Sequence, residues 1–307
     1  MERRYVTADV FTDRMFGGNP LAVVLDAEGL SAPQMQAIAA EFNYAETTFV
    51  LPPSDPVHTA HVRIFTPRSE LPFAGHPNVG TAVILAHDLS AKGGHHVDEF
   101  VFEERAGLVL IRLLRDGAHV VGAELRAPEP LSIRAAVSVN DAAACLSLPP
   151  SDVRSAAHPP QVVSVGLPFL VTELVSREAL RRARPSVVDH ERVLPPIGTD
   201  AIFAYVRGGT AHELHARMFA PLDGIVEDPA TGSAAAATIA LLAALQPEAT
   251  AGVAWRIEQG VDMGRASLLL GKTEKLSGTV GVVRVGGQVI PVMRGVLNVV
   301  SAVGRST

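Results

Sequence analysis

Short runs in which hydrophobic and polar residues alternate recur along most of the chain, a pattern typical of β-strands. Near the start, residues 6–11 and 21–25 form two such runs on either side of Gly17-Gly18-Asn19-Pro20, a segment of turn-forming residues. We therefore predict a hairpin-like pair of strands. A further strand is predicted over residues 46–50, so that Glu46 lies where a helix gives way to a strand and need not be solvated.

A few helices with clear start signals interrupt the strand pattern. Ser31 stands three residues before Gln34, which is the spacing of a capping box, and Asn43 can end the same helix in a left-handed conformation. Two further helices are predicted to begin at Gly75-His76-Pro77 and at Thr231-Gly232-Ser233. Both carry apolar residues on nearly all sides, so we expect them to be buried.

Two distant segments of the chain follow the same order of features. Residues 63–67 and 217–221 are predicted strands that end in proline, and each is followed by a turn, a glycine and an apolar helix. The separation is 12 residues from Arg63 to Gly75 and 15 residues from Arg217 to Gly232, so a three-residue insertion relates the two copies. This order predicts an internal duplication.

Two more pairs extend the duplication. Residues 102–107 match residues 257–260, and more weakly Phe49-Val50 matches Phe203-Ala204. Pro128-Glu129-Pro130 is a plausible crossover between the copies. We therefore expect an N-terminal half over residues 1–127, joined by a C-terminal strand from about 289–307, and a C-terminal half over residues 128–288.

Composition narrows the class of protein. With 307 residues, 48% of them hydrophobic and 19% charged, the chain can bury a large core, and its length suggests two domains. Its most apolar stretch, residues 234–245, is well short of the ~20 residues of a membrane-spanning helix. The net charge of −6, with basic residues clustered only in the predicted surface helix at residues 181–184, argues against a nucleic-acid partner.

The single cysteine, Cys145, excludes an intramolecular disulfide and a catalytic thiol pair, which fits a reducing compartment. Because the N-terminus lacks an apolar signal core, we expect a cytoplasmic protein. Two histidine pairs, His58 with His61 and His95 with His96, lack carboxylates or cysteines at ligand spacing. We therefore predict no metal site.

The two buried helices suggest where chemistry takes place. If the halves are related by a pseudo-twofold, both helix N-termini can face a cleft, where their free N–H groups would bind a carboxylate or stabilise an enolate-like charge. His76 is at one helix start, and Asp228, Thr231 and Ser233 are at the other. Alternatives remain open: Ser233 or Asp228 only caps its helix, His76 is a core histidine, and Glu46 is a surface charge.

Six ordered motifs together resemble the PhzF family of phenazine-biosynthesis isomerases, within the diaminopimelate-epimerase-like superfamily. The resemblance covers nearly the whole chain, and no single motif would suffice. It rests on residues 9–12 with 18–23, 43–50, 63–67, 70–77, 227–234 and 259–265.

The resemblance implies an α+β fold of two pseudo-symmetric halves, each a curved, mostly antiparallel sheet wrapped around a central buried helix. It further implies a site that needs no cofactor, in the cleft between the halves, and a homodimer as the assembly. It also implies that the glutamate matching Glu46 shuttles a proton between two carbons of trans-2,3-dihydro-3-hydroxyanthranilate. A partly desolvated glutamate would have a raised pKa and could serve as both base and acid.

The same resemblance assigns the remaining site residues. The residues matching His76, Asp228 and Ser233 line the substrate, Thr231 is placed beside them, and the glycines matching Gly75 and Gly232 lend backbone N–H groups. Ala45 stands where phenazine-pathway members of the family carry serine, so it is expected to touch the substrate without that hydroxyl.

Two other functions are alternatives for this sequence. Racemisation by two facing cysteines is disfavoured, because neither helix start carries a cysteine and Cys145 lies elsewhere. A non-catalytic small-molecule or protein-binding module of the same fold stays open. The presence of Glu46, His76, Asp228 and Ser233 together argues for the enzyme, since a scaffold needs none of them.

Overall fold

A computed structural model describes residues 2–93 and 97–299 of the chain. These residues divide into two compact units. Among them, unit 1 contains residues 2–16, 20–93, 97–123 and 288–299, and unit 2 contains residues 17–19 and 124–287. The predicted His95 and His96 pair and the last residues of the predicted C-terminal strand lie outside the described residues.

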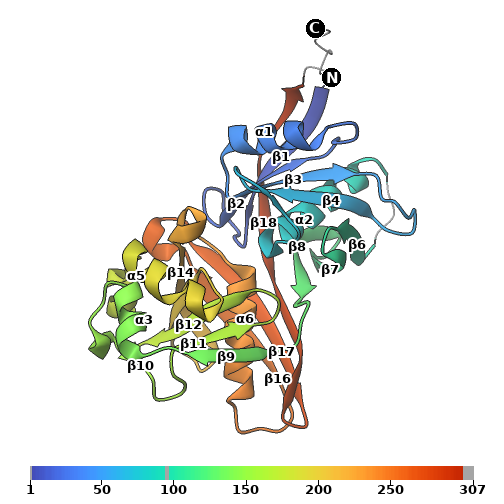
Figure 1. The fold of residues 1–307 in the computed structure, drawn as a ribbon. Helices are drawn as coiled ribbons and strands as arrows, with labels where there is room; N and C mark the ends of the chain where they lie inside the picture. The colour runs from blue at the N-terminus through green and yellow to red at the C-terminus, as the bar shows by residue number, and fades with distance from the viewer. Residues whose placement is uncertain (1, 94–96, 300–307) are drawn as a thin grey trace. The chain divides into compact units, whose positions relative to one another are not determined.

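Unit 1 is a mixed sheet in which antiparallel pairs predominate (Figure 1). Strand β2 runs parallel to β3, β3 antiparallel to β4, β4 parallel to β6 and β6 antiparallel to β7, while β5 pairs with the end of β4. Its strands are β1 (Glu2–Val10), β2 (Asn19–Val24, except Asn19), β3 (Glu46–Leu51), β4 (Ala60–Phe65), β5 (Glu70–Leu71), β6 (Glu99–Glu104), β7 (Gly107–Asp116) and the first part of β8 (His119–Arg126).

Unit 2 repeats this order of pairings. Strand β12 runs parallel to β13, β13 antiparallel to β14, β14 parallel to β16 and β16 antiparallel to β17, while β15 pairs with the end of β14. Its strands are β9 (Ser132–Ala136), β10 (Val153–Arg154), β11 (Gln161–Ser164), β12 (Pro168–Leu174), β13 (Ile202–Arg207), β14 (Glu213–Ala220), β15 (Ile225–Asp228), β16 (Ala251–Gln259) and β17 (Ser267–Leu276).

The long last strand, β18 (Thr279–Asn298), pairs antiparallel with β17 through its first part and with β1 through its second part. The residue registers of the two units also agree. His61 lies opposite Glu103 where β4 meets β6, and His215 lies opposite Glu258 where β14 meets β16.

One predicted match was wrong by one residue. The residue opposite Arg63 is Phe49, whereas the residue opposite Arg217 is Ala204, so Phe49 corresponds to Ala204 and not to Phe203. Two apolar residues in sequence do not show which of them faces the core, because strand register depends on the neighbouring strand.

The predicted first helix is confirmed in detail. Helix α1 (Ala32–Phe42) begins after Ser31, whose hydroxyl accepts a hydrogen bond from the Gln34 N–H while the Gln34 side chain accepts from the Ser31 N–H. It ends at Asn43, which has a left-handed conformation with φ of 53°. The shorter helices of unit 2 are α3 (Val139–Cys145), α4 (Arg177–Arg182) and α5 (Val187–Val193), with 3₁₀ turns at Pro150–Asp152, Pro195–Ile197, Pro221–Asp223 and Val261–Met263.

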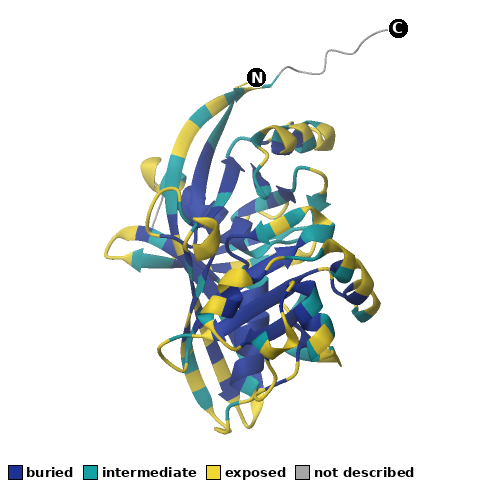
Figure 2. Cartoon of the chain, turned by 90° about the vertical axis from the view of Figure 1, so that its left-hand side faces the viewer, coloured by how far each residue is buried: buried dark blue, intermediate teal, exposed yellow. Residues whose placement is uncertain are grey.

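Each unit contains one long, largely buried helix, as predicted. Helix α2 (Gly75–Ala91) packs against β1, β3 and β7 of unit 1, and α6 (Gly232–Ala244) packs against β11, β12, β16 and β17 of unit 2. Gly80 allows α2 to approach the sheet, because a Cβ there would lie 2.5 Å from Leu21 Cδ2 and 2.8 Å from Val10 Cγ2. In Figure 2 the exposed residues lie on loops, on the outer faces of the peripheral helices and at positions along the long strands such as β17 and β18.

Among the described residues, no helix combines the length and the apolar character that a bilayer crossing needs.

Candidate active site

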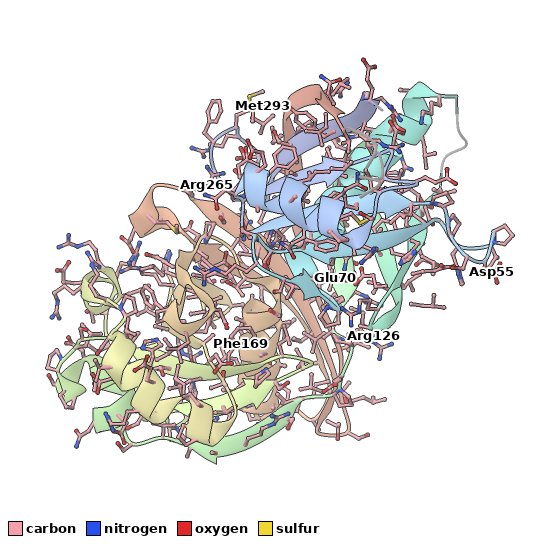
Figure 3. All side chains as sticks on the ribbon, turned by 45° about the horizontal axis from the view of Figure 1, so that its top comes forward. Asp55, Glu70, Arg126, Phe169, Arg265 and Met293 are labelled. Atoms are coloured by element: carbon pink, nitrogen blue, oxygen red, sulfur yellow. The ribbon has the colours of Figure 1, made fainter. Side chains whose placement is uncertain are left out.

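A duplicated arginine–glutamate pair precedes each buried helix. In unit 1, Arg63 Nε and Nη2 donate to the two carboxylate oxygens of Glu70 (2.7 and 2.8 Å), which keeps the pKa of Glu70 below its ordinary value. In unit 2, Arg217 donates in the same way to Glu227 (2.8 and 2.7 Å). The three-residue insertion therefore lies between the arginine and the glutamate. Glu70 is labelled in Figure 3.

These pairs align the two helix starts residue by residue, because five positions separate each glutamate from the first glycine of its helix. Ala74, the N-cap residue of α2, corresponds to Thr231, the N-cap residue of α6. His76 corresponds to Ser233, and Leu71 corresponds to Asp228. The duplicated fold therefore carries different polar groups at its two equivalent helix starts.

In unit 1, the fold brings Glu46 and His76 together. Glu46 is the first residue of β3 and His76 lies in the first turn of α2, and His76 Nε2 is 3.3 Å from Glu46 Oε2. Their side chains are only 12% and 7% exposed, which excludes the alternative that Glu46 is a solvated surface charge. Burial lowers the pKa of His76 to about 3, so its imidazole is neutral at physiological pH.

In unit 2, Asp228 is the centre of a buried hydrogen-bond network. Its Oδ1 accepts from Asn19 Nδ2 (2.9 Å) and its Oδ2 accepts from the Thr231 hydroxyl. Burial raises the pKa of Asp228 to about 6, against the opposing effect of these two donors. Thr231, and not Asp228, is the N-cap residue of α6, and the Thr231 side chain makes no capping hydrogen bond.

Two further residues of this network, Asn19 and Gln259, were not singled out from the sequence. Gln259 accepts from the Thr231 N–H (3.0 Å) and donates to the Asp228 carbonyl (2.8 Å) and the Thr231 hydroxyl (3.0 Å). Arg265, labelled in Figure 3, donates to the carbonyls of Gly17 and Gly18 and so holds the segment that ends in Asn19. The sequence motif over residues 259–265, which contains Gln259 and Arg265, was the signal that could have pointed to this network.

The remaining predicted site residues lie at the ends of the same elements. Gly75 and Gly232 are the first residues of α2 and α6, and Ser233 follows in the first turn of α6. Ala45 directly precedes β3 and is partly buried. Backbone N–H groups in the first turn of a helix lack partners within the helix, so both helix starts are suited to bind an anionic group.

In the part of the chain that the structure describes, no three His, Cys, Asp or Glu side chains converge as metal ligands. His58 Nδ1 instead lies 2.8 Å from Glu103 Oε1, and Cys145 is buried in the core of unit 2.

A family model described as phenazine biosynthesis-like protein, PhzC/PhzF, matches residues 8–295. The chain belongs to this family. The family resemblance read from the six sequence motifs is thereby confirmed, and so is the expected class of enzyme, an isomerase.

Two relatives support the same family, and a solved structure supports the fold. An uncharacterised isomerase from Mesorhizobium japonicum is 40% identical over 96% of this chain and 98% of its own length. The trans-2,3-dihydro-3-hydroxyanthranilate isomerase of Pseudomonas chlororaphis is 36% identical over 95% of this chain and 98% of its own length. The crystal structure of a PhzF-family protein from Bacillus anthracis, 24% identical, matches with a TM-score of 0.85 over 97% of this chain and 100% of that chain, which confirms the α+β fold.

Proposed function

We propose that this protein is a PhzF-type isomerase that moves a proton between two carbons of a small unsaturated cyclic amino or carboxylic acid similar to trans-2,3-dihydro-3-hydroxyanthranilate. The observation that supports it best is the nearly buried pair of Glu46 and His76 at the first turn of α2. A relative that is 36% identical over almost its entire length carries the name of this activity.

The proposed chemistry needs one group that first accepts a proton and then returns it. Ionised Glu46 removes a C–H proton, the electron pair left on carbon delocalises into the adjacent double bond, and protonated Glu46 delivers the proton to the far carbon of that system. No electron is gained or lost overall. His76 is a poor candidate for the proton carrier, because burial disfavours the positively charged imidazolium that His76 would become on accepting the proton.

Binding and charge stabilisation are the proposed roles of the other site residues. The neutral His76 imidazole holds the Glu46 carboxyl in place. Asp228, Thr231 and Ser233 bind polar groups of the substrate, and the backbone N–H groups at Gly75 and Gly232 stabilise its carboxylate or the charge that develops during transfer. Ala45 would contact the substrate without donating a hydrogen bond.

The decisive experiment is Glu46→Gln, which keeps the size and burial of the side chain and removes the base. The wild type and this variant are incubated with trans-2,3-dihydro-3-hydroxyanthranilate in deuterated buffer, and turnover and deuterium incorporation are followed by NMR. We expect turnover to fall by at least about 10²-fold with binding retained, in the range that general acid–base catalysis contributes. Glu41→Gln, on the exposed surface of α1, is the matched control.

Two results would count against the proposal. Near-normal turnover in Glu46→Gln would remove Glu46 from the mechanism. Binding of the compound to the wild type with neither product nor deuterium incorporation would favour a binding module that has kept the fold. The family resemblance further predicts a homodimer, which light scattering on the purified protein measures directly.

A further inference from the structure

Glu104, the last residue of β6, is a buried carboxyl group that the proposed chemistry does not use. Both of its carboxyl oxygens are inaccessible to solvent, and neither has a hydrogen-bond partner among the described residues. The fully buried Asn78 side chain of α2 lies beside it, and Asn78 Oδ1 also lacks a partner among those residues. Burial raises the pKa of Glu104 to about 8, although the neighbouring Asn78 side chain favours the charged form.

The duplication shows what this position does in the other unit. Because His61 lies opposite Glu103 and His215 lies opposite Glu258, the residues that follow, Glu104 and Gln259, are equivalent. Gln259 is hydrogen-bonded to both the N–H and the hydroxyl of Thr231, the N-cap residue of α6. In unit 2, a neutral side chain at this position thus holds the start of the central helix.

In unit 1, the corresponding connection runs through Asn78. Asn78 Nδ2 donates to the carbonyl of Ala74 (3.0 Å), the N-cap residue of α2, which has no side-chain cap. With Nδ2 bonded to the Ala74 carbonyl, Asn78 Oδ1 is a buried acceptor without a hydrogen-bond partner among the described residues. A protonated Glu104 offers an O–H donor to this neighbouring acceptor, whereas an ionised Glu104 leaves both of its own oxygens and Asn78 Oδ1 without a hydrogen-bond partner among the described residues.

The charged groups on the elements around Glu104 are engaged elsewhere. On β4, Arg63 binds Glu70, and Arg105, which follows β6, lies 3.5 Å from Glu70 as well. The residue opposite Glu104 on β7 is Gly107, and the titratable residue of α2 closest in sequence to Asn78 is His76, which burial keeps neutral. Burial, and not a neighbouring charge, is therefore the dominant influence on the Glu104 carboxyl.

We propose that Glu104 is a positioning residue of the isomerase. It acts as a neutral carboxylic acid whose O–H donates to Asn78 Oδ1, and through Asn78 and the Ala74 carbonyl it fixes the first turn of α2, where His76 lies beside Glu46. The part of this inference that concerns catalysis rests on the proposed function; the protonation of Glu104 and its coupling to His76 do not.

The first test needs no substrate. Infrared spectra of the wild type, Glu104→Gln and Glu103→Gln are compared at pH 7, where Glu103→Gln is the control because that neighbouring carboxyl pairs with His58 and has its pKa lowered to about 2. We expect a protonated-carboxyl C=O band that is absent only in Glu104→Gln. In the wild type and the control, the His76 ring resonances should shift as Glu104 ionises near pH 8, and in Glu104→Gln they should not.

The second test is activity on trans-2,3-dihydro-3-hydroxyanthranilate as a function of pH. The wild-type kcat should fall as pH rises through about 8, and Glu104→Gln should retain wild-type kcat at pH 7 and lose this alkaline decline. Glu104→Ala should lower kcat about tenfold with a smaller effect on KM, since it displaces groups that act in the reaction.

The outcomes of these tests distinguish a failure of the positioning role of Glu104 from a failure of the proposed function. If no protonated-carboxyl band is lost in Glu104→Gln, or if the His76 resonances titrate near pH 8 in that variant too, the positioning role of Glu104 is wrong. It is also wrong if an active wild type and Glu104→Gln share the same alkaline decline. If the wild type does not turn over the probe while the spectroscopic results are as expected, the proposed substrate fails and the coupling of Glu104 to His76 stands.

Discussion

Replacing Arg217 by methionine tests whether the two arginine–glutamate pairs stabilise the protein according to their burial. The pairs share the same bidentate geometry, and in each the guanidinium lies over a phenylalanine ring, 5.2 Å from Phe65 in unit 1 and 4.9 Å from Phe219 in unit 2. They differ in environment: the Arg217 side chain is 5% exposed and the Arg63 side chain is 21% exposed. Arg63→Met is therefore a natural control.

The difference in stability follows from what each substitution leaves behind. Arg217→Met leaves the Glu227 carboxylate without its guanidinium and removes a donor from the carbonyls of Leu180, Arg181 and Ala183 (3.1, 3.2 and 2.9 Å) at the end of α4. Breaking a buried pair in this way costs about 3–5 kcal/mol. Arg63→Met should cost about 1 kcal/mol, because Glu70 keeps Arg105 at 3.5 Å and reaches water.

Urea unfolding of both variants, followed by circular dichroism at pH 7, measures this difference. We expect the free energy of unfolding to fall by roughly 2–4 kcal/mol more in Arg217→Met than in Arg63→Met, the difference between the two costs above. Adding Glu227→Leu to Arg217→Met should restore part of the loss, because the unpaired buried charge is then gone. Equal losses in the two single variants would refute the argument that burial sets the cost.

Two further predictions concern packing and pH. Gly80→Ala should destabilise the protein by about 1–3 kcal/mol through overpacking against Leu21, an effect that the better helix propensity of alanine partly offsets. Gly252→Ala is the control and should be nearly neutral, because a Cβ there meets nothing within 4 Å. Thermal unfolding compares the two variants, and equal melting temperatures would contradict the close approach of α2 to the sheet. Asp228 holds its proton more tightly in the folded state, with a pKa of about 6 against 3.8 in the unfolded chain, so its contribution to stability is lost as pH rises between these values. Asp228→Asn should remove that dependence in unfolding measurements from pH 4 to 7, and an unchanged slope would show that Asp228 is not the group responsible.

Local signals in the sequence predicted local structure well. Helix α1 has the predicted capping box and the predicted end at Asn43, because both depend on hydrogen bonds between residues a few positions apart. The starts of α2 and α6 followed from a proline in a first turn and from glycine-containing turns. Two phenylalanines with positive φ, Phe11 and Phe16, carried no such signal, since hydrogen bonds from their backbone N–H groups to the Gln288 carbonyl and to Asp9 Oδ2 accompany that conformation.

The sequence by itself determined the three helices α1, α2 and α6, several strands, the duplication, the family and the residues Glu46, His76, Asp228 and Ser233 as candidates. Only the tertiary structure decided the partners of these residues: Asn19 reaches Asp228 across 209 positions, and Gln259 reaches Thr231 across 28. It also decided that Glu104 is buried without a hydrogen-bond partner among the described residues. Residue spacing reports neighbours along one element, whereas burial, and with it the pKa of a carboxyl group, depends on strands and helices that the chain brings together from distant positions.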